Sequence, residues 1–419
     1  MEKVLVIGSG GREHAICDAL KRSDEVSKVY CAPGNAGIAK IAECLPIKET
    51  DVEALCAFAL DKDLALTVVG PEVALAAGVV DRFKKAGLRI FGPNKAAAMI
   101  ESSKEFAKEL MKKYDIPTAA FETFEEYEPA MEYVRKGTLP AVLKYDGLAA
   151  GKGVVIAETY EEADEALKDM LLNDKFGKGK VVIEDFLDGP EFSFMCFVDR
   201  DNVYPMQLSQ DHKRAYDNDK GPNTGGMGAY SPVPFITKED EEYAMNEIMI
   251  PTAKAMIAEG APYSGVLYGG LIKTSNGIKV IEFNARFGDP ETEIVLPRLK
   301  SDIYNIFCAI ADGKKAEIEW HDFATLGIVL ASKGYPGDYE KGAIIKGMES
   351  VKAKAYHMGT AQEGRNLVTA GGRVMIVVGK GATLKEAQED ALAEVEKIEC
   401  DNLFHRTDIG HWAIKIDIK

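Results

Sequence analysis

The stretch MEKVLVIGSGGREH, residues 1–14, decides the fold of the region that follows it, because a short apolar run leads directly into a glycine-rich turn. Val4 to Ile7 is typical of a buried β-strand, and further apolar runs at 64–69 and 89–91 alternate with helical patterns. Strands that alternate with helices form parallel sheets covered by helices. We therefore expect residues 1–101 to form an α/β domain on a doubly wound parallel sheet.

Composition and charge narrow the class of protein. Of the 419 residues, 46% are apolar and 28% are charged, and 51 basic against 67 acidic residues give a net charge of −16. Nucleic acids and anionic membranes attract basic surfaces, so we expect no nucleic-acid partner and no membrane partner. The sequence has no apolar run of about 18 residues, no basic-then-apolar leader and no CxxC pair among its 7 cysteines. These features predict a reduced, cytoplasmic protein.

The rest of the chain is typical of α+β structure. Residues 102–325 combine helical patterns with strands that flank a small glycine loop, which predicts a compact lobe at about 119–190. Residues 199–235 are rich in Asp, Asn, Gly and Pro, which predicts a long functional loop region. Short β-type runs and one helical pattern follow in residues 326–419, which we expect to form a β-rich domain.

Two glycine turns are expected at the carboxyl edge of the parallel sheet. Gly10 and Gly11 open the first helix, and Gly34 and Asn35 follow the second strand. Backbone N–H groups at such turns bind phosphate, and ligands of open α/β sheets bind at this edge. A dinucleotide fingerprint would need a third glycine where Glu13 stands, so a small phosphate is favoured over a nicotinamide cofactor. The alternative is that the turns serve tight packing only.

The most informative motif is a glycine-rich loop between two predicted strands, residues 144–153 (KYDGLAAGKG). It is not a Walker loop, because its spacing differs and Gly153 replaces the Ser or Thr that would hold magnesium. Its backbone N–H groups, with Lys144 and Lys152 on the two flanks, can fold over a triphosphate and neutralise it. A plain hairpin turn with solvated lysines is the alternative.

Polar side chains on three later strands suit a nucleotide and a cation. Glu184 ends a predicted buried strand, where it can accept a hydrogen bond from an adenine amino group, and Glu191 is suited to two ribose hydroxyls. Either glutamate alone is more often a surface residue. Glu282, Asn284 and Arg286 are spaced at i, i+2 and i+4, which places them on one face of a strand. Such a face is costly to bury without partners, and a hard cation that bridges phosphate oxygens supplies them.

The chain resembles the ATP-grasp ligases in the spacing of Lys104, Lys144, the glycine-rich loop, Glu184, Glu191, Glu282 and Asn284. Longer motifs resemble, more specifically, the glycinamide ribonucleotide synthetase family. They occur in the same order and span nearly the whole chain: 8–14 (GSGGREH), 146–153 (DGLAAGKG), 210–228 (QDHKRAYDNDKGPNTGGMG), 286–291 (RFGDPE) and 405–410 (HRTDIG).

The resemblance implies an ATP-dependent ligation of glycine to 5-phosphoribosylamine. The reaction would pass through glycyl phosphate and give glycinamide ribonucleotide, ADP and phosphate, as in de novo purine biosynthesis. The architecture implied is an N-terminal α/β domain, an ATP-grasp core at 102–325 with a small lid domain, and a C-terminal β-rich domain. ATP, glycine and 5-phosphoribosylamine are the expected small-molecule partners, with Mg²⁺ or Mn²⁺ as the metal. The sequence is compatible with a monomer.

The resemblance also implies a role for each candidate residue. Catalysis would depend on Arg286, Lys144 and Lys213, and the metal would bind Glu282 and Asn284. The nucleotide would be bound by Lys104, Lys144, Asp146, Gly147, Gly151, Lys152, Gly153, Glu184, Leu187 and Glu191. The substrates would be bound by Gly10, Gly11, Gly34, Asn35, Asp211, Gly288 and Asp289, with the phosphate of the amine on the glycine turns and the glycine ammonium near Asp211 and Asp289.

One departure and two alternatives bear on this interpretation. Many ATP-grasp enzymes take a further carboxylate from the preceding strand, but residues 265–272 contain no acid, so a second cation would need phosphate oxygens and water. A biotin-carboxylase-like enzyme, or another ATP-grasp carboxylate–amine ligase, is the first alternative, and the biotin-carboxylase reading would leave residues 210–228 unexplained. The second is a nucleotide-binding module without catalysis, which would not need Arg286.

Overall fold

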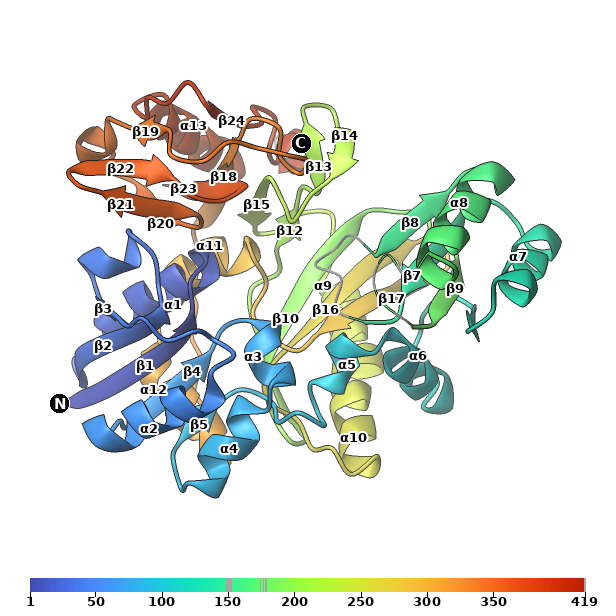
Figure 1. The fold of residues 1–419 in the computed structure, drawn as a ribbon, viewed down its shortest axis with the longest axis horizontal. Helices are drawn as coiled ribbons and strands as arrows, with labels where there is room; N and C mark the ends of the chain where they lie inside the picture. The colour runs from blue at the N-terminus through green and yellow to red at the C-terminus, as the bar shows by residue number, and fades with distance from the viewer. Residues whose placement is uncertain (148–152, 174, 176, 178, 418–419) are drawn as a thin grey trace.

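The computed structural model describes residues 1–147, 153–173, 175, 177 and 179–417. It confirms the predicted fold class: an N-terminal parallel sheet, an antiparallel core with a small lobe, and a C-terminal part rich in antiparallel sheet. In Figure 1 the N-terminal part (blue) and the C-terminal part (orange and red) lie next to each other on the left, and the small lobe lies at the far right.

The N-terminal sheet is parallel, with strand order β3-β2-β1-β4-β5. Its strands are β1 (Glu2–Gly8), β2 (Val26–Pro33), β3 (Glu43–Cys44), β4 (Leu66–Val69) and β5 (Ile90–Phe91). The apolar run from Val4 to Ile7 is completely buried in the centre of the sheet, as the continuous apolar pattern predicts. The helices of this part are α1 (Gly11–Lys21), α2 (Val52–Lys62), α3 (Glu72–Ala76) and α4 (Val79–Lys85), with a 3₁₀ turn at Ile38–Lys40.

A second, antiparallel sheet forms the core of the molecule, with strand order β11-β10-β16-β17. Its strands are β10 (Glu191–Asp199), β11 (Asn202–Pro205), β16 (Ser264–Thr274) and β17 (Gly277–Asn284). Two helices, α5 (Met99–Ser102) and α6 (Lys104–Lys113), connect the N-terminal sheet to the rest of the chain. The other helices of this part are α9 (Lys238–Tyr243), a π-helical turn (Ala244–Met249), α10 (Ile250–Ala258), α11 (Glu291–Val295), a 3₁₀ turn (Leu296–Arg298) and α12 (Ile303–Ala311).

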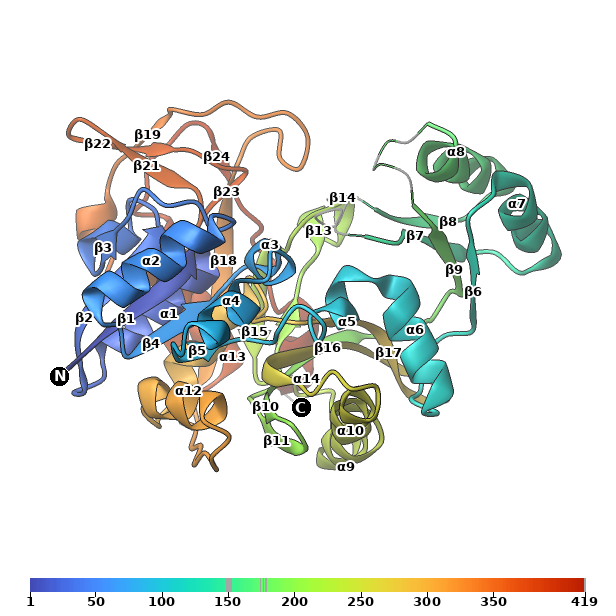
Figure 2. The same cartoon turned by 60° about the horizontal axis from the view of Figure 1, so that its bottom comes forward.

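The small lobe is a four-stranded antiparallel sheet backed by two helices. Its strand order is β6-β9-β7-β8, and the elements are β6 (Phe121–Phe124), α7 (Tyr127–Lys136), β7 (Ala141–Tyr145), β8 (Val154–Ala157), α8 (Tyr160–Leu171) and β9 (Val181–Asp185). Leu143, Leu167 and Ile183 belong to a hydrophobic cluster that is separate from the main core. Figure 2 shows the lobe apart from the N-terminal sheet, in agreement with its separate hydrophobic cluster.

The C-terminal part contains two antiparallel sheets, a two-stranded hairpin and two helices. The larger sheet comprises β12 (Gln210–Asp211), β15 (Gly228–Ser231), β18 (Ala324–Ser332), β23 (Arg373–Gly381), β20 (Lys354–His357) and β24 (Leu403–Phe404). The smaller sheet comprises β19 (Ile344–Ile345), β22 (Asn366–Thr369) and β21 (Thr360–Glu363). The hairpin is β13 (Arg214–Tyr216) and β14 (Lys220–Asn223), the helices are α13 (Leu384–Val395) and α14 (His411–Asp417), and a 3₁₀ turn lies at Met348–Ser350.

The region 199–235, which composition predicts to be a long loop, contains the short strands β11 to β15. The pairing of β15 explains the difference, because Gly228 lies opposite Ile328 of β18, a partner distant in the sequence. Local composition does not encode such a partner. The larger C-terminal sheet therefore includes residues on both sides of the expected domain boundary near residue 325, and the boundaries themselves stay a prediction.

Four phenylalanines join the N-terminal sheet to the core sheet. Phe307 of α12 lies with its ring centroid 4.3 Å from that of Phe91 of β5, and 6.2 Å and 6.0 Å from those of Phe197 and Phe287. All four side chains are buried. This cluster holds the carboxyl edge of the parallel sheet against the core sheet. In the part of the chain that the structure describes, no helix is long and apolar enough to cross a membrane.

We expect Phe307→Ala to lower the free energy of unfolding by about 3–5 kcal/mol, because the four-ring cluster leaves a cavity when one ring is removed. Urea denaturation followed by circular dichroism measures the change. Phe186→Ala is the matched control, since that ring is 41% exposed and its loss should change the free energy of unfolding little. Equal losses for the two variants would contradict a role of the cluster in joining the sheets.

Candidate active site

The two glycine turns lie side by side at the carboxyl edge of the parallel sheet. The backbone N–H of Gly34 donates to the carbonyl of Gly8 (3.0 Å), and the side-chain amide of Asn35 donates to the carbonyl of Ser9 (2.8 Å). The first turn runs directly into α1. The structure thus brings together the four residues that the sequence placed at these turns, Gly10, Gly11, Gly34 and Asn35.

Glu13 explains why the first turn departs from a dinucleotide fingerprint. Its carboxylate accepts a hydrogen bond from the backbone N–H of Gly10 (2.6 Å) and pairs with Arg12 (2.5 Å). A Cβ at Gly8 or at Gly70 would lie 2.5 Å or 2.0 Å from the Glu13 side chain, so a larger residue at either position would displace the Glu13 carboxylate. The turn is therefore shaped around a buried acid. Gly11 serves packing as well, because its Cβ would lie 2.4 Å from Glu293 Oε1.

A buried cluster of two lysines and one glutamate lies beside the glycine-rich loop. Lys144 Nζ lies 2.8 Å from Glu184 Oε1 and donates to the carbonyl of Ile281 (2.9 Å), while Lys108 Nζ lies 2.7 Å from Glu184 Oε2. Burial lowers the pKa of Lys108 to about 8, although Glu184 opposes the shift. The carboxylate that the sequence suggested for an adenine amino group therefore lies between two ammonium groups. Leu187, two residues beyond β9, is half-buried.

Asp146 fastens the glycine-rich loop to helix α6. Its carboxylate accepts hydrogen bonds from the backbone N–H groups of Lys104 (2.5 Å) and Glu105 (3.2 Å), which lie in the first turn of α6. Lys104 Nζ donates to the carbonyl of Gly147 (3.2 Å), and Gly153 accepts from the backbone of the strand before the loop. The predicted residues Gly151 and Lys152 lie outside the described residues.

The end of β17 gathers the predicted metal ligands and Arg286. Asn284 is the last residue of the strand, and Arg286 Nη2 donates to Asn284 Oδ1 (3.2 Å). The guanidinium of Arg286 also pairs with Glu101 (2.9 Å) and with Glu72 (3.4 Å). Burial alone would lower the pKa of Arg286, but these two carboxylates raise it, so the side chain stays charged.

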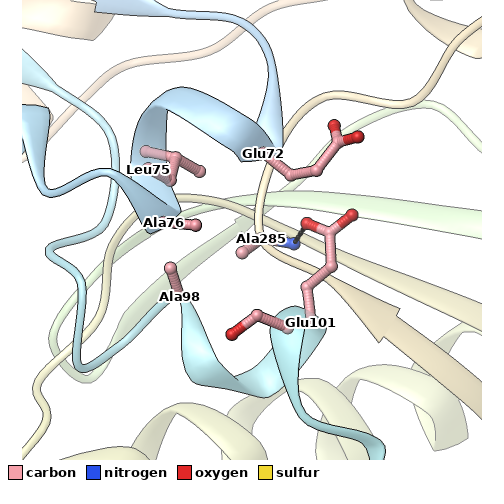
Figure 3. A pocket seen from close by; sticks show the side chains of 7 residues that line it. Glu72, Leu75, Ala76, Ala98, Glu101 and Ala285 are labelled. Atoms are coloured by element: carbon pink, nitrogen blue, oxygen red, sulfur yellow. Dashed lines mark hydrogen bonds between the residues drawn. The ribbon is translucent and has the colours of Figure 1, made fainter. Parts of the chain in front are cut away.

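Glu72 and Glu101 line a small pocket between α3, α5 and the end of β17 (Figure 3). Glu101 accepts a hydrogen bond from the backbone N–H of Ala285 (2.7 Å), which fixes its carboxylate beside the strand end. Figure 3 shows the Glu72 carboxylate on the same side of this pocket as that of Glu101. The two acids come from the N-terminal part and from the connecting helix. They bring both parts to the strand that contains Glu282.

A second pocket lies on the core sheet between β10, β12 and β16. Its polar lining consists of Glu191, Ser193, Asp211, Lys213, Tyr268 and Glu282. Lys213 Nζ lies 3.3 Å from Glu191 Oε2. Burial raises the pKa of Asp211 to about 7, although Lys213 opposes this shift. Asp211 and Glu191 in turn raise the pKa of Lys213. The structure thus brings four predicted residues into one pocket: Glu191, Asp211, Lys213 and Glu282.

Asp289 lies elsewhere, between the first glycine turn and the C-terminal sheet. Its carboxylate pairs with Arg373 (2.8 Å), and a Cβ at Gly10 would lie 3.4 Å from Asp289 Oδ2. It is therefore not among the residues that line the pocket of Asp211. Gly288 leaves room for a neighbouring acid, because its Cβ would lie 2.5 Å from Glu291 Oε2.

The donors at the end of β17 suit a hard divalent cation. Burial would raise the pKa of Glu282, but Lys213, Lys144, Lys104 and Arg286 together lower it, so this carboxylate is ionised as a ligand must be. Within the described ranges, no group of three or more His, Cys, Asp or Glu side chains could hold a metal ion. A magnesium ion that binds one carboxylate together with substrate phosphates does not need such a group.

Sequence reasoning missed several residues of the site. Lys108 and Glu101 are buried or nearly so and belong to no motif, and the buried Arg12 lies within the motif 8–14 but was given no role. Glu72 had a usable signal, because Gly70-Pro71-Glu72 directly follows β4 at the same sheet edge as the glycine turns. Arg12 Nη1 and Arg286 Nη1 both donate to the carbonyl of Phe287, at 3.2 Å and 3.3 Å.

Family models match most of the chain. The N domain of phosphoribosylglycinamide synthetase matches residues 2–101, its ATP-grasp (A) domain matches residues 102–292, and its C domain matches residues 325–412. A protein of Halalkalibacterium halodurans named phosphoribosylamine–glycine ligase is 54% identical over 415 residues, which are 98% of this chain and 97% of that protein. A protein of the same name from Streptococcus pneumoniae is 51% identical over 419 residues, covering 99% of this chain and 100% of the relative.

Solved structures extend the comparison. The crystal structure of phosphoribosylamine–glycine ligase from Thermotoga maritima is similar with a TM-score of 0.87 and 35% identity, over 97% of this chain and 100% of that one. Biotin carboxylase from Campylobacter jejuni, at 14% identity and a TM-score of 0.73 over 99% of this chain and 95% of that one, shares the fold alone. On the family models and on relatives about half identical over nearly its whole length, the chain belongs to the phosphoribosylglycinamide synthetase family, whose core is an ATP-grasp domain.

Proposed function

We propose that this protein is an ADP-forming ligase that joins glycine to 5-phosphoribosylamine. The observation that carries the proposal is the gathering of Lys213, Lys144, Lys104 and Arg286 around the half-buried carboxylate of Glu282, whose pKa they lower against the effect of desolvation. Cations around a carboxylate that can hold a metal are what phosphoryl transfer needs. The names of the relatives support the identity of the two substrates.

The chemistry needs no protein nucleophile. A glycine carboxylate oxygen attacks the γ-phosphorus of ATP, the bond to the β–γ bridging oxygen breaks, and ADP leaves. The amine of 5-phosphoribosylamine then attacks the acyl carbon of glycyl phosphate. The C–N bond forms, phosphate leaves with the bonding electron pair, and the nitrogen loses a proton. Positioning and charge neutralisation supply most of the acceleration in such transfers.

The residues around Glu282 divide these tasks. We assign Lys104, Lys144 and the loop 146–153 to the triphosphate, and Arg286 and Lys213 to the charge that develops on the transferring phosphoryl group. Glu184 would act by holding Lys144 and Lys108 in place, because its two oxygens already face their ammonium groups. A divalent cation held by Glu282 and Asn284 would neutralise phosphate oxygens. Leu187 and Glu191 remain the candidates for adenine and ribose.

The phosphate of the amine is assigned to the two glycine turns. The contacts between Asn35 and Ser9 and between Gly34 and Gly8 support this, because they hold both turns at one edge of the sheet. The segment that begins at Arg286 passes the first turn at Asp289, which connects the phosphoryl-transfer end of the site with the glycine turns. We assign the reaction of the amine with the acyl group to the region between them.

An assay of ADP release with each substrate omitted in turn tests the proposal. ADP should form only when ATP, glycine and 5-phosphoribosylamine are all present with Mg²⁺. Turnover that requires bicarbonate and biotin would instead favour the carboxylase alternative. Nucleotide binding without any turnover would favour a binding module.

We predict that Glu282→Gln lowers turnover by about a hundred- to a thousandfold, because an amide replaces the anionic ligand at the phosphoryl-transfer site. Asn284→Asp is the paired variant, which keeps an oxygen ligand and should lose less activity. ADP release at several magnesium concentrations measures both, and thermal melts run beside it. Unfolding of Glu282→Gln would show that Glu282 is a structural partner of the surrounding cations.

The raised pKa of Asp211, about 7, predicts a pH-dependent affinity for glycine. An ammonium binds the ionised carboxylate and not the protonated acid, so the KM for glycine should fall as the pH rises through this value. Asp211→Asn cannot ionise there and should show a high KM that does not vary with pH. The KM for ATP, measured in the same series, is the internal control, and a parallel change in it would contradict the assignment.

A further inference from the structure

We propose that Ser193 and Tyr268, together with Asp211, bind the ammonium group of the amino-acid substrate, and that Glu291 positions the two hydroxyls for this task. The inference rests on the proposed function, because it names residues that would recognise one of the two ligated substrates. None of the three residues Ser193, Tyr268 and Glu291 has a motif-derived role in the ligation.

The three side chains form a buried network directly behind the second pocket. Tyr268 Oη donates to Glu291 Oε1 at 2.6 Å, and Ser193 Oγ donates to the same oxygen at 2.9 Å. The two hydroxyl oxygens lie 2.8 Å apart. Ser193 and Tyr268 line the pocket, whereas Glu291, in the first turn of α11, is not part of the lining. The hydroxyls thus stand between the carboxylate and the pocket.

This arrangement uses both hydroxyl protons within the network. A carboxylate only accepts hydrogen bonds, and each hydroxyl has a single proton to donate. Each proton goes either to Glu291 or, across the 2.8 Å contact, to the other hydroxyl, and in both cases each oxygen keeps at least one lone pair for another partner. The hydroxyls therefore present acceptors to the pocket, and Asp211 in the same lining adds a carboxylate.

The set of acceptors matches a primary ammonium. An ammonium group has three N–H donors and no acceptor, and Ser193 Oγ, Tyr268 Oη and the Asp211 carboxylate can take one each. The lining holds a single basic residue, Lys213, against three acids, Glu191, Asp211 and Glu282. The further cations Lys144, Lys104 and Arg286 act on Glu282, so we assign the cationic group of a ligand to Asp211 and the two hydroxyls. Because Glu282 and Lys213 line the same pocket, the carboxylate of a short amino acid would point toward the proposed phosphoryl-transfer end.

The pocket-facing hydroxyls are tested with Tyr268→Phe and Ser193→Ala in the ADP-release assay. Each variant removes one hydrogen bond to a charged group, so the KM for glycine should rise about ten- to a hundredfold while the KM for ATP and for 5-phosphoribosylamine changes little. Tyr263→Phe and Ser209→Ala are the matched controls. Both are buried on or beside the core sheet and lie outside the pocket lining.

Glycolate, in which a hydroxyl replaces the ammonium, separates recognition of the charge from packing. Its inhibition constant against glycine should be nearly the same in the parent enzyme and in both variants, because a hydroxyl donates only one hydrogen bond. Glu291→Leu should raise the KM for glycine as the two hydroxyl variants do, and Glu291→Gln should recover part of the loss through its amide oxygen. Thermal melts identify any variant that fails to fold, and the inference is judged on the variants that do fold.

Three outcomes would overturn the inference while leaving the proposed function standing: an unchanged KM for glycine in Tyr268→Phe and Ser193→Ala, equal increases in the KM of every substrate, or equal effects in the controls. If the parent protein releases no ADP with glycine and 5-phosphoribosylamine, the proposed function itself is wrong. ADP release by the unmodified protein therefore distinguishes a failure of the inference from a failure of the proposed function.

Discussion

The ion pairs of the Arg286 guanidinium, whose side chain is 18% exposed, are the interaction on which the arrangement of the site depends. The guanidinium pairs with Glu101 and Glu72 and donates to Asn284 and to the carbonyl of Phe287. These partners come from α5, α3 and the end of β17, so one side chain connects the core sheet with the N-terminal part. Removal of Glu101, the more buried of the two acids, would leave the partly desolvated guanidinium without its nearer counter-charge. The elements that meet at Arg286 are therefore held in one arrangement.

The segment that follows β17 connects Arg286 to the rest of the site through further contacts. After Arg286, Asp289 pairs with Arg373 of the C-terminal sheet, and Glu291 accepts hydrogen bonds from two hydroxyls of the core sheet. Glu293 then lies against Gly11 of the first glycine turn. A few consecutive residues thus contact all three main parts of the molecule. The relative positions of the metal ligands, the second pocket and the glycine turns follow from this short path.

The small lobe is connected to the site by fewer and more local contacts. Asp146 caps the first turn of α6, and Lys144 reaches the core sheet through the carbonyl of Ile281. The lobe has its own hydrophobic cluster. Its hydrophobic cluster is therefore separate from the core of the sheets, whereas Lys144 and Asp146, at the start of the glycine-rich loop, are held by these polar contacts.

The sequence by itself determined the parallel N-terminal sheet and the antiparallel β17 with its polar face, and it pointed to Lys104, Lys144, Lys213, Glu282 and Arg286 as members of a candidate site. These features repeat with the period of a strand or helix, or lie within one short motif, so that neighbouring residues specify them. Only the tertiary structure decided that Glu184 lies between Lys144 and Lys108, that Asp289 pairs with Arg373 and that Glu101 and Glu72 hold Arg286. The same holds for the strands β12 and β15 within the expected loop. The physical reason is that each of these contacts joins residues far apart in the chain. A buried charge and an unpaired strand both need a partner, and the packed fold determines which residue is close enough to be that partner.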